Sequence, residues 1–210
     1  MGTLARLKPH DRVLVVGITG SGKSHFVKER IVTPAKRVVV WDPHAEYAVK
    51  CDLDEVCFWE LQNEPELLKQ RHLRLSIVPE WDDIDELVEQ LCQLVRLLRR
   101  SRGKHTTTLV IEECGVIRPR GDGVLGLLST QARHWNVPLV MVAQRAAQVP
   151  PTAREQVSRI ISFRQSSPDD IAALTERIGD VKGSKIASLP RRHFVTWSES
   201  DAFKTKGEPK

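Results

Sequence analysis

Short apolar runs alternate along this chain with longer segments in which apolar residues recur every three or four positions. Runs that are rich in β-branched residues and bounded by turn-forming residues predict buried β-strands. These runs occupy residues 12–16, 37–41, 73–78, 107–111, 138–143, 159–163 and 193–197. Strands that alternate with helical segments predict an α/β fold, in which helices cover both faces of a mostly parallel sheet.

Two helices are marked clearly by their boundaries. One begins at Lys23 and is expected to end near Thr33-Pro34, because the residue before a proline is displaced from helical geometry. The other spans residues 83–100, where the apolar residues keep the 3.6-residue spacing of a helix. Asp82 or Asp83 is expected to cap its N-terminus.

A third helix is predicted over residues 123–135. Its apolar face is expected to hold Val124, Leu127, Leu128, Gln131 and Trp135. Its polar face is expected to hold Ser129, Thr130 and Arg133.

Length and composition bound the domain organisation. The 210 residues, 40% of them hydrophobic, predict one globular domain over residues 1–200 and a polar tail over 201–210. No apolar run approaches the roughly 18 residues of a membrane span, and the N-terminus lacks a signal-peptide pattern, so we expect a cytosolic protein. The four cysteines show neither metal-ligand spacing nor a C-x-x-C motif, which favours reduced thiols.

The strongest chemical signal is the stretch from Gly17 to Ser24, GITGSGKS, which matches the phosphate-binding loop G-x-x-x-x-G-K-[ST] and directly follows the first predicted strand. The backbone N–H groups of such a loop and the positive end of the following helix suit a triphosphate. Lys23 is expected to reach the β- and γ-phosphates, and the Ser24 hydroxyl to bind Mg²⁺. A glycine-rich turn with a solvated lysine is the alternative, but all four specified positions match. The predicted ligands of ATP are Gly17, Thr19, Gly20, Ser21, Gly22, Lys23 and Ser24.

Two further predicted strands end in polar residues suited to hydrolysis. The run 107–111 leads into Glu112-Glu113, and the run 138–143 leads into Gln144. Glu112 is expected to hold the Mg²⁺ shell, and Glu113 to orient or deprotonate an attacking water. Gln144 is expected to sense the γ-phosphate or to position water. Polar residues also mark the points where buried strands meet solvent, and this remains the alternative for all three.

The net charge of +5, from 32 basic and 27 acidic residues, is too small to identify a polyanion-binding protein, but the basic residues are clustered. Each cluster is suited to sequence-independent contact with nucleic-acid phosphates. Favourable charge at a helix C-terminus, or ordinary solvated loops, explains the clusters equally well. The clusters are Arg96, Arg99, Arg100, Arg102, Lys104 and His105; Arg118 and Arg120; and Arg191-Arg192-His193.

The order of five sequence blocks resembles the HerA/FtsK superfamily of DNA-pumping ATPases. The blocks lie within about residues 10–197 and read GITGSGKS, VVVWDPHAEY, TLVIEE, VPLVMVAQR and RIISFRQSSPDDIAALTERIG. The length is closest to that of the small genome-packaging ATPases of membrane-containing icosahedral viruses. The resemblance implies a RecA-like sheet, with the Gln144 strand between the strand of the phosphate loop and the strand of the acidic pair. It also implies a ring, commonly hexameric, around double-stranded DNA.

The resemblance assigns roles residue by residue. It places Lys23 on the phosphates, Ser24 on Mg²⁺, Glu113 at the catalytic glutamate and Gln144 at the sensor position. Glu112 departs from the usual aspartate, although its longer side chain is still expected to reach the metal shell through water.

Two other parts of the resemblance concern residues 42–47 and an arginine. Residues 42–47, D-P-H-A-E-Y, resemble the family block D-P-H-G-E-Y, and either a turn with a capped helix start or a catalytic part fits them. The resemblance also implies an arginine near the subunit interface, which would complete the site of a neighbouring subunit. Arg133 is the first candidate for this role, and a solvated surface arginine is the alternative reading. The further candidates are Arg145, Arg159 and Arg164.

Taken with these features, the resemblance implies an ATP-driven translocase of double-stranded DNA, a viral genome-packaging motor subunit that acts in a ring and contacts the DNA backbone. Such a motor is expected to dock on a capsid vertex or portal protein, in the host cytoplasm or at the virion vertex. A pilus, phage-assembly or helicase-type NTPase is one alternative. A small-molecule kinase is another, but it requires an arginine-bearing lid and an acceptor pocket, and the sequence shows no convincing lid.

Overall fold

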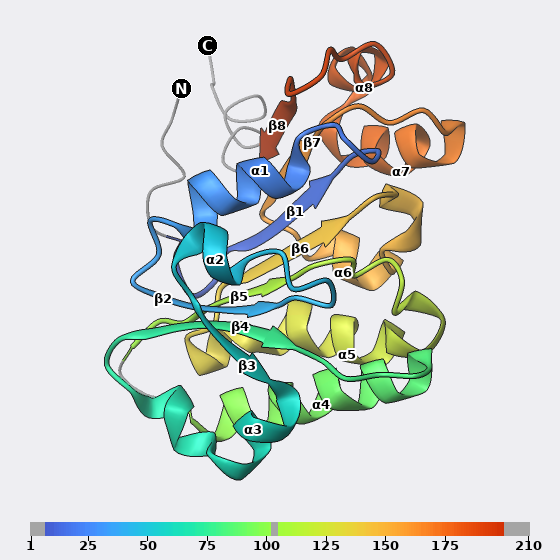
Figure 1. Ribbon diagram of the computed structural model, residues 1–210. Coiled ribbons are helices and arrows are strands. Elements are labelled where there is room, and N and C mark those ends of the chain that lie inside the picture. Colours follow the sequence, from blue (N-terminus) through green and yellow to red (C-terminus); the bar gives the residue numbers. More distant parts are fainter. Residues whose placement is uncertain (1–6, 102–104, 200–210) are drawn as a thin grey trace, which may run out of the picture.

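In the computed structural model, residues 7–101 and 105–199 are described, and for residues 118–122 and 181 only the backbone is described. Eight strands of this part of the chain form one sheet in the order β3-β4-β2-β5-β6-β1-β7-β8 (Figure 1). All neighbouring strands are parallel except β7 and β8. The strands are β1 (Arg12–Val16), β2 (Arg37–Trp41), β3 (Asp54–Cys57), β4 (Leu73–Val78), β5 (Thr108–Ile111), β6 (Leu139–Ala143), β7 (Arg159–Ser162) and β8 (Val195–Ser198).

Helices cover both faces of this sheet, so the α/β fold and the parallel sheet predicted from the sequence are confirmed. In Figure 1, α1 and α2 lie on one face of the sheet, and α4 and α5 lie on the other. The helical segment from Lys23 runs through α1 and continues as the π-helical turn η1 to Val32, so its end lies where the sequence predicted. The expected reason was wrong, because Thr33, directly before the proline, keeps helical geometry with φ −56° and ψ −46°. The α-helices are α1 (Lys23–Val27), α2 (Ala48–Cys51), α3 (Phe58–Asn63), α4 (Ile84–Arg100), α5 (Arg118–Gln131), α6 (Pro151–Glu155), α7 (Pro168–Ile178) and α8 (Asp180–Ile186). One π-helical turn, η1 (Lys28–Val32), and three 3-10 turns, η2 (Pro65–Lys69), η3 (Ala132–Trp135) and η4 (Ala146–Gln148), complete the helical elements of the described residues.

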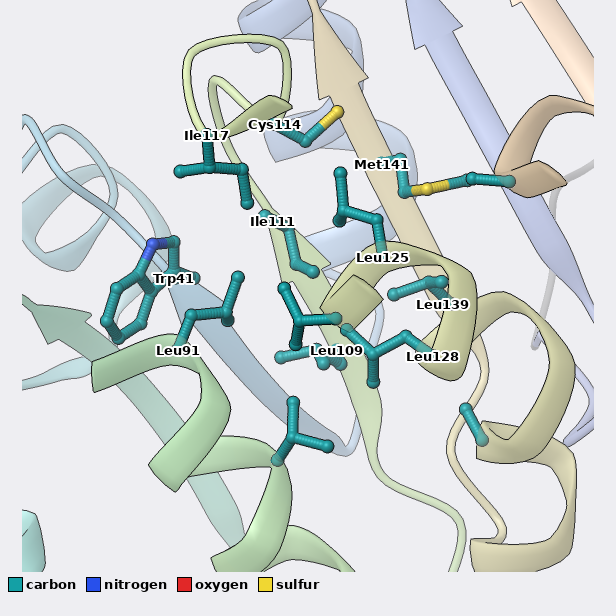
Figure 2. Packing of buried hydrophobic residues seen from close by; sticks show 14 of the residues in the cluster. Trp41, Leu91, Leu109, Ile111, Cys114, Ile117, Leu125, Leu128, Leu139 and Met141 are labelled. Carbon is teal, nitrogen blue, oxygen red and sulfur yellow. The ribbon is translucent and has the colours of Figure 1, made fainter. Parts of the chain in front are cut away.

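The core has two halves, because successive residues of each central strand point to opposite faces of the sheet. In β1, Leu14 and Val16 pack in the half between the sheet and helices α4 and α5. Val13 and Val15 pack in the half between the sheet and helices α1 and α2. Figure 2 shows the first half, where side chains of the sheet and of α4 and α5 converge. Burial on both faces explains why the strand sequences are continuously apolar instead of alternating.

The central strands lie within one or two residues of their predicted positions, but β3 was not predicted. Its sequence, Asp54-Glu55-Val56-Cys57, begins with two exposed acidic residues and lacks a β-branched run. β3 lies at the edge of the sheet and pairs only with β4. An edge strand that buries little side-chain surface carries almost no hydrophobic signal in the sequence.

The third predicted helix is longer at its start and is rotated about its axis relative to the prediction. It begins at Arg118 instead of residue 123, and the α-helix gives way to the η3 turn after Gln131. Leu127 is 46% exposed and Gln131 is exposed, so the predicted apolar face is wrong at these two positions. The buried face of the helix is formed by Val124, Leu125, Leu128, Ala132 and Trp135.

Ser129, which was predicted on the polar face, is fully buried. Its hydroxyl donates to the Leu125 carbonyl oxygen at 2.6 Å, and its own carbonyl accepts from Arg12 Nε. A small hydroxyl that is satisfied within its own helix costs little to bury. The prediction from periodicity alone therefore placed the buried face of α5 about one residue away from its observed position.

None of the helices in the described ranges has the length and hydrophobicity that a bilayer span requires. All four cysteines are free thiols, and Cys51 and Cys114 are buried, while Cys57 and Cys92 are partly exposed. Burial raises the pKa of the Cys114 thiol, which keeps it protonated.

Asp83, and not Asp82, is the N-cap of α4. Asp83 has extended backbone geometry, and its Oδ1 accepts hydrogen bonds from the N–H groups of Asp85 at 2.8 Å and Glu86 at 3.0 Å. We expect Asp83→Ala to lower the free energy of unfolding by about 1 kcal/mol, because it leaves these N–H groups without their partner. Asp82→Ala is the matched control, and denaturant unfolding of both variants measures the difference. Equal losses for the two variants would contradict the assignment.

Candidate active site

The loop between β1 and α1 owes its shape to glycines at fixed positions. Gly22 precedes α1 with φ 112°, a conformation that strains any residue with a side chain. A Cβ on Gly17 would lie 2.5 Å from Cβ of Phe163, which follows β7. The loop therefore packs against a segment almost 150 residues away, and glycine is the only residue that fits position 17 without displacing it.

Lys23 is held inside this loop. Its side chain is 7% exposed, and Nζ donates to the carbonyl oxygen of Ile18 at 3.3 Å. Burial lowers the pKa of Lys23, while the nearby carboxylates of Glu113 and Glu112 oppose that shift. A buried ammonium with a single carbonyl partner is well placed to exchange that carbonyl for the oxygens of an incoming phosphate.

A line of hydrogen bonds crosses the carboxyl ends of three neighbouring strands. Gln144 follows β6, and its Nε2 donates to Oε1 of Glu113 after β5 at 3.0 Å. Thr19 of the phosphate loop donates through Oγ1 to Oε1 of Gln144, also at 3.0 Å. The structure thus brings Thr19, Glu113 and Gln144 together at an edge that solvent reaches.

Glu113 has φ 51°, in the left-handed region that is uncommon for residues other than glycine. This conformation turns the chain at the end of β5, so that Glu112 and Glu113 point to different surroundings. Glu113 is partly exposed, whereas Glu112 is 8% exposed. Backbone in this sparsely populated region persists only where the surrounding structure holds it, and such residues cluster at functional sites.

Glu112 lies in a buried polar network. One of its oxygens, Oε1, accepts a hydrogen bond from the hydroxyl of Tyr47. Burial raises the pKa of Glu112 to about 7, with the carboxylates of Glu113 and Asp42 contributing in the same direction and Tyr47 and Lys23 opposing them. A cation placed beside this carboxylate would favour its ionised form.

The donor set fits a magnesium ion that arrives with a nucleotide. Ser24 and Glu112 offer a hydroxyl and a carboxylate, which are the hard oxygen ligands that Mg²⁺ prefers. Residues 7–101 and 105–199 contain no group of three or more His, Cys, Asp or Glu side chains suited to hold an ion. Mg²⁺ is typically bound by one or two protein oxygens together with nucleotide phosphates, and Ser24 and Glu112 are the residues that would supply the protein oxygens.

Arg133 does not lie near these residues. It belongs to the η3 turn, which precedes β6 and therefore lies at the opposite edge of the sheet from Gln144. Its side chain is exposed, and Nε donates to Nε2 of His134 at 3.3 Å. Arg133 is therefore positioned away from the nucleotide loop of its own chain.

The other candidate arginines lie elsewhere. Arg145 directly follows Gln144 and pairs through Nε with Oδ2 of Asp170 at 3.1 Å. Arg159 begins β7 at the distant edge, opposite Val13. Arg164 is exposed beside the phosphate loop, where its carbonyl accepts from the N–H of Ile18 at 2.9 Å.

Two features of the site were missed from the sequence. The first is the pair Asp42 and Tyr47. They belong to the D-P-H-A-E-Y block at residues 42–47, which the sequence marked by its resemblance to the family but to which no single role was assigned. The second feature is the turn near residue 191, where Arg191 Nε donates to the Gly20 carbonyl at 3.2 Å and the Arg192 N–H donates to the Ser21 carbonyl at 2.9 Å. One basic cluster thus lies against the phosphate loop, and no local sequence signal predicts a contact across about 170 residues.

A parallel sheet whose first strand enters a G-x-x-x-x-G-K-S loop, with acidic and amide residues at the ends of the next strands, defines a P-loop NTPase. The chain belongs to a family of this class: residues 10–114 match the family model described as the central domain of helicase HerA.

Individual relatives extend the similarity over most of the chain. Protein P9 of Pseudoalteromonas phage PM2 is 27% identical over 198 residues, which cover 90% of this chain and 85% of that protein. The DNA-packaging ATPase B204 of Sulfolobus turreted icosahedral virus superposes with a TM-score of 0.71 at 19% identity, over 93% of this chain and 95% of that one. VirB4 of Thermoanaerobacter pseudethanolicus superposes with a TM-score of 0.67 at 11% identity, over 86% and 84% of the two chains. The two structural matches show that the fold is shared.

The buried carboxyl group of Glu112 predicts a pH dependence of stability. Its pKa is higher in the folded protein than in the unfolded chain, so the folded state keeps the proton to higher pH. The free energy of unfolding should therefore fall between about pH 5 and pH 8, by roughly 3 kcal/mol from this group, since one pKa unit corresponds to about 1.4 kcal/mol. Glu112→Gln should flatten this decline. Denaturant unfolding across that range, in EDTA and without nucleotide, measures it, and parallel pH profiles of the two proteins would refute the prediction.

Proposed function

We propose that this protein is an ATP-driven motor that moves double-stranded DNA, and that it packages a viral genome as a subunit of a ring docked at a capsid vertex. The observation that carries the proposal is the line from Thr19 through Gln144 to Glu113, which joins the phosphate loop to a carboxylate suited to activate water. The family relationship to helicase HerA and the structural match to a DNA-packaging ATPase support a function in DNA movement.

In this proposal, each residue of the site has a distinct task. The loop N–H groups and Lys23 bind the phosphates, and Lys23 leaves the carbonyl of Ile18 to do so. Glu113 accepts the proton of the attacking water while Gln144 holds its carboxylate in orientation. Mg²⁺, held by Ser24 and Glu112, would neutralise the charge on the β- and γ-phosphates.

The same line offers a route from the site to the rest of the domain. Gln144 is followed by Arg145, whose side chain pairs with the buried Asp170 of α7, and Asp170 also accepts the N–H of Ala147 at 2.9 Å. The carbonyl of Gln144 accepts from Nε2 of the buried Gln165 at 3.2 Å. A change at Gln144 on loss of the γ-phosphate would therefore act on α7 and on the segment after β7.

We place the DNA contacts on the C-terminal end of α4. Arg99 and Arg100 are exposed there, and Arg99 lies over the ring of Trp135 at 5.9 Å from its centroid. Arg96 is engaged with Glu89 at 3.6 Å on the same helix. Arg102 and Lys104 of this cluster lie outside the described residues, as do the side chains of Arg118 and Arg120.

We also propose that Arg133 acts on the site of a neighbouring subunit. Its exposed side chain lies at the opposite edge of the sheet from its own phosphate loop. A role for Arg133 in hydrolysis therefore requires a ring in which that edge meets the next nucleotide. A guanidinium supplied in this way typically accelerates phosphoryl transfer by about 10³–10⁵.

Substitutions of Lys23 and Glu113 should affect nucleotide binding and ATP hydrolysis differently. Lys23→Ala should abolish productive nucleotide binding, because it removes the cation that neutralises the β- and γ-phosphates. Glu113→Gln should keep the affinity and lower turnover by about 10²–10⁴, because it removes the proton acceptor. Titration with a fluorescent ATP analogue and assays of phosphate release measure the two effects. Near-normal turnover in Glu113→Gln with an inactive Glu112→Gln would exchange the roles of the two acids.

The DNA proposal predicts a steep dependence on salt. Long duplex DNA should stimulate ATP turnover, and its affinity should fall with salt and vary little between random sequences. Arg99→Gln and Arg100→Gln should each lower the slope of log K against log salt by about 1. Arg30→Gln, an exposed arginine on η1, is the control and should leave the slope unchanged. Stimulation by a nucleoside monophosphate instead of DNA would favour a kinase.

A further inference from the structure

Tyr47 is the only tyrosine of the chain, and it is buried beside the candidate active site. Its hydroxyl donates to Oε1 of Glu112, although the two residues lie 65 positions apart. The other oxygen of this carboxylate, Oε2, accepts no hydrogen bond from the described residues. One oxygen is thus occupied by the protein, and the second is left for a ligand.

The backbone around Tyr47 is fixed by a second buried acid. Asp42 directly follows β2, and its Oδ2 accepts both the N–H of Tyr47 and the hydroxyl of Ser76, each at 2.9 Å. Ser76 belongs to β4, so the carboxylate of Asp42 is held against the sheet. The turn that carries Tyr47 is thereby tied to two neighbouring strands.

The ring of Tyr47 is in contact with a buried cation. Nζ of Lys28 lies 4.5 Å from the ring centroid and forms an ion pair with Oε2 of Glu46 at 3.2 Å. Lys28 is itself buried and belongs to η1, the continuation of the helix that follows the phosphate loop. The backbone contact, the ring contact and burial together leave the hydroxyl little freedom to move away from Glu112.

A glutamate at position 112 needs such an anchor more than an aspartate would. The glutamate side chain has one more rotatable bond than that of aspartate. If the carboxylate becomes ordered only when the ligand binds, the loss of conformational entropy at that bond weakens binding. A hydrogen bond from a buried and immobile hydroxyl sets the orientation before the ligand arrives. It also satisfies a carboxylate oxygen that would otherwise be buried without a partner.

We propose that Tyr47, held in place by Asp42, is a positioning residue that orients Glu112 toward the magnesium ion of the bound nucleotide. This inference rests on the proposed ATPase function. It assigns a task to residues 42–47: Asp42 fixes the turn, Tyr47 orients one oxygen of Glu112, and Glu112 presents the other oxygen. The effect concerns metal-dependent binding, because the hydrogen bonds to side chains and the cation contact that Tyr47 makes within the described residues involve Asp42, Glu112 and Lys28 and not the phosphate loop.

The test compares nucleotide affinity with and without the metal. Tyr47→Phe keeps the ring and its contact with Lys28 but removes the hydroxyl. We expect the affinity for a fluorescent ATP analogue to fall about tenfold in saturating Mg²⁺ and to change less than about twofold in EDTA, as for loss of a hydrogen bond to a charged group. Ser129→Ala, which removes a buried hydroxyl of α5, is the control and should change neither value. Equal losses in Mg²⁺ and EDTA would overturn the inference.

A double-mutant cycle identifies the partner. Glu112→Asp withdraws the carboxylate by one methylene from the hydroxyl of Tyr47, so Tyr47→Phe should cost less than about threefold in that background. A full tenfold loss in the Glu112→Asp background would show that Tyr47 acts through some other group. If Tyr47→Phe does not fold by circular dichroism, Asp42→Asn supplies the second variant. It keeps the hydroxyl, loosens the turn and should weaken binding only in Mg²⁺, whereas equal weakening in EDTA would refute the assignment.

The wild-type protein separates this inference from the function on which it rests. Nucleotide binding that is tightened by Mg²⁺, together with ATP turnover, supports the proposed function whatever Tyr47→Phe does. Normal behaviour of the wild type with an unaffected Tyr47→Phe would remove Tyr47 from the site and leave the ATPase in place. A wild type that neither binds nor hydrolyses ATP would reject both.

Discussion

The position of β6 between β1 and β5 is the constraint on which the candidate site depends. β6 hydrogen-bonds to both neighbours, so the residues that follow these three strands emerge side by side. Thr19, Gln144 and Glu113 are separated by up to 125 positions in the sequence, yet their side chains form a continuous line. In this order one strand separates the phosphate loop from the acidic pair, and the amide of Gln144, which follows that strand, accepts from Thr19 and donates to Glu113.

Burial of charge is the second theme of this structure. Lys23, Asp42 and Glu112 are all less than a tenth exposed, and isolated charges in such surroundings are strongly unfavourable. Each is compensated differently: Lys23 by a loop carbonyl and two nearby carboxylates, Asp42 by an N–H group and a hydroxyl, and Glu112 by Tyr47. Lys23 and Glu112 are incompletely compensated, and this leaves both groups ready to bind a phosphate and a cation.

Distant segments brace the phosphate loop from outside. The ring of Phe163 packs edge-on against Phe26 of α1, and Phe194 lies against both rings. The turn before Phe194 donates the N–H of Arg192 to the loop. The loop is thus supported by the segments before and after the last two helices. Movement of α7 and α8 relative to the sheet would change that support, which connects the nucleotide site to the C-terminal third of the domain.

The sequence by itself determined the central strands, the helix from Lys23, the long helix α4 and the phosphate loop, because burial on two faces and glycine-rich turns leave local signals. It also placed Glu112, Glu113 and Gln144 at one edge of the sheet, since the carboxyl ends of parallel strands share an edge. It missed β3, which has no continuous apolar run, and it misjudged the face of α5, where a self-satisfied serine is buried.

The tertiary structure alone decided the contacts between residues far apart in the chain. Tyr47 meets Glu112, Phe163 meets Gly17, and Arg192 meets Ser21 because strand order and helix packing bring their segments together. No periodicity or motif encodes such contacts. Local sequence sets the preference of each segment for helix, strand or turn, whereas the partners of a buried polar group follow from the packing of the whole sheet.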